Sequence, residues 1–119
     1  MATMRQTRRS RTLPVSRTRA WRVLTHPATA PVWLGGHGAV DLRAPGNTGV
    51  LSEPDGTLRH VVVDAAVPGE RVRLRWWTDR GPGVEPSVVE IDLAEDGEVT
   101  VITATETALA DAPLPLTAP

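Results

Sequence analysis

The sequence predicts an α+β fold in which one curved antiparallel sheet follows a pair of short helices. The first third of the chain carries helix-start and helix-stop signals. From Ala39 onward, short runs of β-branched and apolar residues are divided by turn residues, and several runs alternate apolar with polar residues. Such alternation is typical of strands with one buried face. We therefore expect about six or seven strands and one apolar face that must be covered.

Length and composition indicate one domain. The chain has 119 residues, of which 40% are hydrophobic and 23% charged, as in ordinary globular proteins. We expect a single domain over 1–119, with a core at 5–109 and a proline-rich tail at 110–119. No apolar stretch is long enough to cross a bilayer, and the arginine-rich start lacks the apolar run of an export signal. We therefore expect a cytoplasmic protein without a membrane partner.

Proline and capping residues define the first three elements. Residues 5–13 favour only an extended edge strand, which the next proline ends. Ser16 is a good N-cap for a helix that a following proline must stop by about Thr25. Residues 31–34 then favour a short second helix that two glycines end.

The rest of the chain reads as strands separated by Pro, Gly, Asn and Asp turns. The predicted strands are 40–43, 49–53, 58–67, 71–77, 89–93 and 99–106. The glycine-rich segment 35–38 before them is interpreted as a flexible loop at the mouth of a cavity, because it lacks the strand and helix that flank a phosphate-binding loop.

Alternation assigns side chains to the two faces of the sheet. Trp76 and Trp77 are adjacent on a strand, so they point to opposite faces, one as a core residue and the other as a surface or interface anchor. On the solvated face, Arg73 and Arg75 can face two acidic residues of the next strand. We expect these acids to be Glu90 and Asp92.

Charge is distributed unevenly along the chain. Seven of the thirteen arginines precede the first acidic residue, Asp41, which leaves six arginines against fourteen acidic residues in the remainder. A basic arm of this kind could contact nucleic acid or an anionic membrane. We favour a solvated strand and helix face whose arginines pair with the acidic remainder, so nucleic acid is not the expected partner.

The residue types exclude several chemistries. The absence of cysteine excludes disulfides, thiolate nucleophiles and Cys-based metal sites. The three histidines, His26, His37 and His60, lack paired ligand spacing and define no catalytic triad. We expect no metal, no cofactor and no catalytic residue, and a binding role is favoured over an enzyme.

Five segments together carry a family resemblance. They are 11–27 (RTLPVSRTRAWRVLTHP), 33–35 (WLG), 55–57 (DGT), 68–77 (PGERVRLRWW) and 85–93 (EPSVVEIDL). In order and spacing they resemble the START-like, or SRPBCC, superfamily, and within it the bacterial homologues of the C-terminal domain of the heat-shock-protein-90 ATPase activator. The resemblance covers about residues 5–109.

The resemblance implies a helix-grip fold, in which a curved antiparallel sheet wraps around a long C-terminal helix and leaves a cavity for apolar or amphipathic molecules. Here residues 107–119 are too few for that helix and include three prolines, so we expect it to be absent or truncated. The apolar face would then be covered by the tail, a second copy of the chain, another protein or a bound lipid-like molecule.

By position in the family, seven residues would contact the ligand. They are Trp33, Leu74, Trp76, Ile91, Ile102, Ala104 and Glu106. Glu106 is the one carboxyl group in this apolar set. It could act as a general acid or base, and the simpler interpretation is a carboxylate paired with an arginine or reached by water.

The leading hypothesis is therefore binding of a small hydrophobic molecule in the cavity over the concave sheet face. A second hypothesis is a co-chaperone-like interaction module that dimerises or docks a protein partner through the same face. A weaker third hypothesis, by analogy with some START-like relatives, is a polyketide cyclase or dehydratase.

Overall fold

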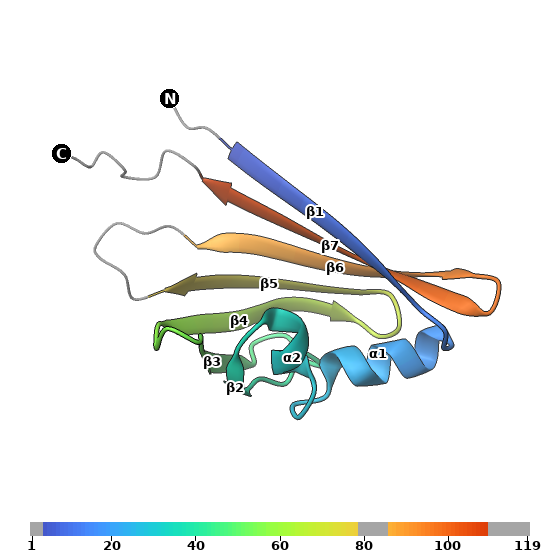
Figure 1. Cartoon of the computed structure of the whole chain (residues 1–119), viewed down its shortest axis with the longest axis horizontal. Coiled ribbons are helices and arrows are strands. Elements are labelled where there is room, and N and C mark those ends of the chain that lie inside the picture. Colours follow the sequence, from blue (N-terminus) through green and yellow to red (C-terminus); the bar gives the residue numbers. More distant parts are fainter. Residues whose placement is uncertain (1–3, 79–85, 110–119) are drawn as a thin grey trace.

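The structure is a computed structural model that describes residues 4–78 and 86–109 (Figure 1). Seven strands form one curved antiparallel sheet in the order β1-β7-β6-β5-β4-β3-β2. The strands are β1 (Met4–Leu13), β2 (His37–Ala39), β3 (Thr48–Ser52), β4 (Leu58–Val67), β5 (Arg71–Thr78), β6 (Ser87–Asp96) and β7 (Val99–Leu109). The α+β class and the antiparallel sheet predicted from the sequence are confirmed.

The two helices form where their capping residues predict. Helix α1 (Arg17–Thr25) begins after Ser16, whose Oγ accepts a hydrogen bond from the Arg19 backbone N–H at 3.2 Å. Helix α2 (Ala30–Leu34) ends at Gly35, which takes the left-handed conformation with φ 78°. In Figure 1, α2 lies beside β2 and β3, while the ends of β1 and β7 near the chain termini extend away from both helices.

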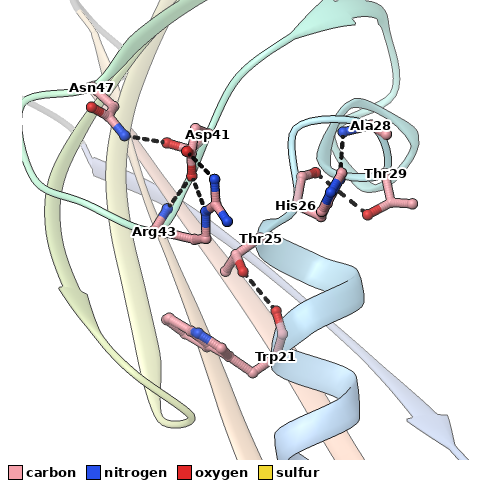
Figure 2. Close-up of polar contacts among 8 residues, drawn as sticks. All are labelled: Trp21, Thr25, His26, Ala28, Thr29, Asp41, Arg43 and Asn47. Carbon is pink, nitrogen blue, oxygen red and sulfur yellow. Dashed lines mark hydrogen bonds and ion pairs between the residues drawn. The ribbon is translucent and has the colours of Figure 1, made fainter.

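The strand predicted at 40–43 is wrong, because these residues form a turn that follows β2. The Asp41 carboxylate accepts hydrogen bonds from the Arg43 backbone N–H at 2.9 Å and from its guanidinium at 2.8 and 2.7 Å (Figure 2). Asn47 Nδ2 also donates to the Asp41 carbonyl oxygen at 3.0 Å. Val40 and Leu42 are buried within this turn, so the apolar residues alternate with polar ones as they would in a strand with one buried face.

The glycine-rich loop predicted at 35–38 is partly a strand. Residues His37 and Gly38 belong to β2, where His37 pairs with Ser52 and Gly38 with Leu51 of β3. A Cβ on Gly38 would lie 2.4 Å from the carbonyl oxygen of Val50, and φ there is 145°. This close backbone approach requires glycine, so Gly38 serves strand pairing.

Of the ion pairs predicted between β5 and β6 for Arg73 and Arg75, only that of Arg73 is observed. Arg73 Nη1 lies 3.6 Å from Glu90 Oε2, as expected, whereas Asp92 accepts from Arg71 Nε at 2.6 Å. Arg75 bonds instead to Asp64 on β4, at 2.8 and 2.9 Å. The reason is register, because the residue opposite Arg75 on β6 is valine.

The core lies between the helices and the concave face of the sheet. Its buried members are Ala20, Leu24, Ala30, Leu34, Val40, Leu42, Leu51, Val61, Val63, Val72, Leu74, Val89, Ile91, Leu93 and Ile102. Trp76 packs against this core, whereas Trp77 stacks on His60 with ring centroids 5.5 Å apart. Because alternate strand residues point to opposite faces, the two adjacent tryptophans are separated as predicted.

The prediction of a proline-rich tail at 110–119, and with it most of the prediction that the C-terminal helix is absent or truncated, concerns residues outside the described ones. Within the described part of the chain, neither helix is long and apolar enough to cross a membrane.

Candidate functional site

A groove of about 590 Å³ lies between α2 and the pair of strands β1 and β7. We call it the edge groove. It is lined by Arg9, Ser10, Arg11, Val32, Trp33, Ile102 and Ala104. These residues come from three segments that are distant in sequence, so the groove exists only once the first and last described strands have paired.

The apolar floor of the edge groove is formed by two side chains of β7 that point to the concave face. Ile102 is buried in the core and Ala104 is partly buried at its margin. Their directly paired neighbours on β1 are Arg11 and Arg9, respectively. Residues that pair directly across two strands share a face, so both arginines lie on the same side as the apolar floor.

Trp33 forms the aromatic wall of the edge groove. It lies near the C-terminal end of the short helix α2, just before the left-handed Gly35, and packs partly buried against the core. The Arg11 guanidinium carbon lies 5.8 Å from the centroid of the Trp33 ring, within the range of a cation–π contact. This contact links the wall to the charged rim on β1.

A layer of polar groups crosses the concave face beside the edge groove. Trp76 Nε1 donates to Glu106 Oε2 at 2.8 Å, and the Arg59 guanidinium lies 4.2 Å from the Trp76 ring centroid. Arg59 Nη2 in turn lies 2.6 Å from Glu53 Oε2, an ion pair without hydrogen-bond alignment. A chain of contacts therefore runs from Glu53, just after β3, through Arg59 and Trp76 to Glu106 on β7.

The seven residues predicted to contact a ligand fall into three groups. Trp33, Ile102 and Ala104 line the edge groove. Leu74 and Ile91 are buried in the core and are not among the lining side chains.

The remaining two, Trp76 and Glu106, are bonded to each other in the polar layer. The Glu106 carboxylate, expected to meet an arginine or water, has the indole N–H as its hydrogen-bond donor. It is only partly buried, as is Trp76.

Three arginines of the candidate site were not predicted as site residues from the sequence. Arg9 and Arg11 appeared as part of a solvated basic arm, and Arg59 was not singled out. Alternation in 58–67 does place Arg59 on the face of Val61 and Val63, so a signal for it was present. For Arg9 and Arg11 the face of β1 depends on its pairing with β7, which no local pattern provides.

The arrangement suits binding better than bond-making chemistry. His60 stacks on the convex face against Trp77, and His26 Nδ1 accepts a hydrogen bond from the Ala28 backbone N–H after α1 (Figure 2). Neither histidine lines the edge groove. In the portion of the chain that the structure describes, no three His, Asp or Glu side chains are grouped as metal ligands.

A second depression, of about 400 Å³, lies on the convex face. It surrounds Arg73 and Glu90, whose charged groups already pair with each other, together with Val88 and Thr105. Its charged groups already pair with each other on the outer surface of the sheet. We therefore interpret this depression as an ordinary hollow of the protein surface. We place the candidate site on the concave face.

Comparison with known proteins adds the family and the fold. The family model described as "Activator of Hsp90 ATPase homolog 1-like protein" matches residues 14–117. No curated protein matches the chain.

Three similar solved structures illustrate the shared fold. DynU16, from the dynemicin biosynthetic locus, has a TM-score of 0.73 at 22% identity, covering 92% of this chain and 39% of its own. Protein MLL2253 from Mesorhizobium loti has a TM-score of 0.74 at 22% identity, with coverages of 87% and 76%. PFC0360w, an HSP90 activator from Plasmodium falciparum, has a TM-score of 0.68 at 14% identity, with coverages of 87% and 73%. The chain thus spans well under two-thirds of DynU16, and at these identities the likeness establishes the fold alone.

Proposed function

Because the chain belongs to the family of Activator of Hsp90 ATPase homolog 1-like proteins, we propose that it binds a small apolar or amphipathic molecule in the edge groove. The observation that carries this proposal is the combination of an apolar floor, Ile102 and Ala104, with an aromatic wall, Trp33. A volume of about 590 Å³ is that of an ordinary small-molecule site, and such sites are lined mainly by apolar and aromatic side chains.

The driving force would be removal of apolar surface from water. The partly buried Ala104 and Trp33 present apolar surface to the groove, and a ligand that covers it gains ~25 cal/mol per Å² on each partner. Binding of this kind requires no catalytic group. The groove is lined by two arginines, a serine and apolar side chains, which suit binding. A cyclase or dehydratase activity has no residue in the groove to support it beyond family analogy.

The proposal is tested with N-phenyl-1-naphthylamine, a neutral apolar probe whose own emission rises on binding. We expect saturable binding by the wild-type chain. Ala104→Trp should abolish it, because the added ring fills the floor of the groove. The matched control is Ala94→Trp, at an exposed position of β6, which should bind the probe as the wild type does. No saturable binding of the probe to the wild type would contradict binding of neutral apolar molecules, and equal binding by Ala104→Trp would contradict binding in the edge groove.

A protein partner is the second candidate, and one observation favours it. β1 is an edge strand of ten residues whose only partner among the described strands is β7, so one row of its backbone groups is available to an added strand. The same variants separate the two functions. Ala104→Trp leaves the outer edge of β1 intact, so a protein that adds a strand there would still bind to a variant that has lost the probe.

A further inference from the structure

Arg9 and Arg11 place two positive charges on the rim of an apolar groove. Each is directly paired with a floor residue, Arg9 with Ala104 and Arg11 with Ile102, so the register of β1 and β7 aims both toward the same space. Residues two apart on a strand are about 7 Å apart. That spacing allows both guanidinium groups to contact one small anionic group.

These two arginines differ from those of the convex face in their partners. Arg71, Arg73 and Arg75 each have a carboxylate within 3.6 Å or less. Arg9 and Arg11 form no ion pair with any carboxylate in residues 4–78 and 86–109. Their side chains are exposed, so their charges remain available to a ligand.

Arg11 is also held in position. Its guanidinium carbon lies 5.8 Å from the centroid of the Trp33 ring, within cation–π range, and no carboxylate among the described residues pairs with the guanidinium. Guanidinium groups bind carboxylate, sulfonate or phosphate through two parallel hydrogen bonds, which a lysine cannot do. The wall residue thus orients the rim residue toward the groove.

The opposite side of the site carries the opposite charge. Glu106 lies two residues beyond Ala104 on β7 and is held by Trp76 Nε1 at 2.8 Å. A negative group on a ligand is therefore attracted toward Arg9 and Arg11 and repelled from the Glu106 end. This asymmetry would keep the anionic end of a ligand beside the two arginines and away from Glu106.

We propose that the ligand of the edge groove is an amphipathic anion, whose carboxylate or similar group is bound by Arg9 and Arg11 while its apolar chain lies over Ile102 and Ala104 against Trp33. This inference rests on the proposed function and adds the charge and the orientation of the ligand to it.

The test compares decanoate with 1-decanol, which share a chain length and differ in charge. Each is titrated at pH 7.5 as a competitor of N-phenyl-1-naphthylamine, and the readout is the ratio of the two affinities. Hydrogen bonds to a charged group predict that the wild-type chain binds decanoate at least ~10-fold more tightly than decanol. In the Arg9→Gln/Arg11→Gln variant the ratio should fall to about 1.

Arg8→Gln is the matched control. Arg8 is the neighbour of Arg9 on β1, but it pairs with Thr105 and so points to the convex face. Its removal takes one positive charge from β1, half the change in the double variant, and the ratio should stay at the wild-type value. Ionic strength provides a second test that uses the wild-type chain alone. Added salt should weaken the binding of decanoate but should not weaken the binding of decanol.

The outcomes separate the inference from the proposed function. Equal affinity for decanoate and decanol, or a preference that survives in the double variant, overturns the anion inference while probe binding still supports the groove. Decanoate binding measured directly by calorimetry, without probe binding, would support the inference and restrict the groove to charged ligands. If neither the probe nor decanoate binds, both proposals fail.

Discussion

Asp41 organises the turn that replaces a strand after β2. Its carboxylate accepts from both the backbone and the side chain of Arg43; the Arg43 side chain is exposed and the Asp41 side chain is partly buried. The hydrogen bonds from Arg43 lower the pKa of Asp41 from 3.8 to about 2, and the same contact raises the pKa of the Arg43 guanidinium. The turn is therefore stabilised by the ionised form of one carboxyl group.

A pH titration should reveal this contribution. Because the folded pKa lies below the unfolded one, the stabilisation is fully present above about pH 4 and is lost as the pH falls through about 2. We expect wild type to be more stable than Asp41→Asn at pH 5 and the difference to shrink between pH 4 and pH 2. Urea unfolding followed by tryptophan fluorescence measures it. A difference that is unchanged at pH 2 would rule out this origin, since asparagine keeps the backbone hydrogen bond but cannot ionise.

The segment between β2 and β3 is an element in its own right, although it has no regular structure. Gly46 N–H donates to the Val63 carbonyl oxygen at 2.8 Å, and Val63 N–H donates to the Asn47 carbonyl oxygen at 2.9 Å. Leu42 N–H donates to the carbonyl oxygen of Thr25 at 3.2 Å, which ties the segment to the end of α1. These bonds join the segment to β4 on one side and to the end of α1 on the other.

Glycine at position 49 is what allows this segment to approach β3. A Cβ there would lie 2.6 Å from the Val40 Cβ and 2.7 Å from the Ala39 carbonyl oxygen. We expect Gly49→Ala to lower the free energy of unfolding by ~1–3 kcal/mol through overpacking. The neighbouring Thr48→Ala, at an exposed position, should stay within ~0.5 kcal/mol of wild type. Urea midpoints compare the two, and equal midpoints would show that the backbone relaxes without cost.

At the scale of the whole molecule, the two ends of the described chain are joined. β1 pairs with β7 over ten residues, from Met4 opposite Leu109 to Leu13 opposite Thr100 (Figure 1). Thr100 Oγ1 also donates to the Val15 carbonyl oxygen at 2.9 Å, which continues the contact into the start of α1. β1, the first strand in the sequence, pairs with β7, the last. We therefore expect residues 1–119 to fold as one cooperative domain.

Coincident unfolding transitions would support this expectation. Far-UV circular dichroism reports the sheet, and the four tryptophans report α1, α2 and both faces of β5. The two signals should give the same midpoint in urea. Leu74→Ala, at a fully buried position, should lower both midpoints together by removing ~2–5 kcal/mol. Two separated transitions would contradict a single domain.

Local signals were sufficient for much of the fold. Ser16 and the proline after α1 bound one helix, and Gly35 ends the other, because capping and proline geometry act within a few residues. The strand at 58–67 was predicted with its observed bounds, and alternation in β5 assigned Trp76 and Trp77 to their faces. The turn at Asp41 was missed because buried side chains in a turn can alternate as they do in a strand.

The sequence by itself therefore determined the class of fold and the order of most of its elements, and the family resemblance pointed to Trp33, Ile102 and Ala104 as candidate ligand contacts. Only the tertiary structure decided which charges meet the floor of the edge groove. Side chains on a strand alternate with a period of two, so a one-residue slip of β1 against β7 would bring Arg8 to the groove in place of Arg9. That register joins residues almost a hundred positions apart, and no pattern within β1 contains it.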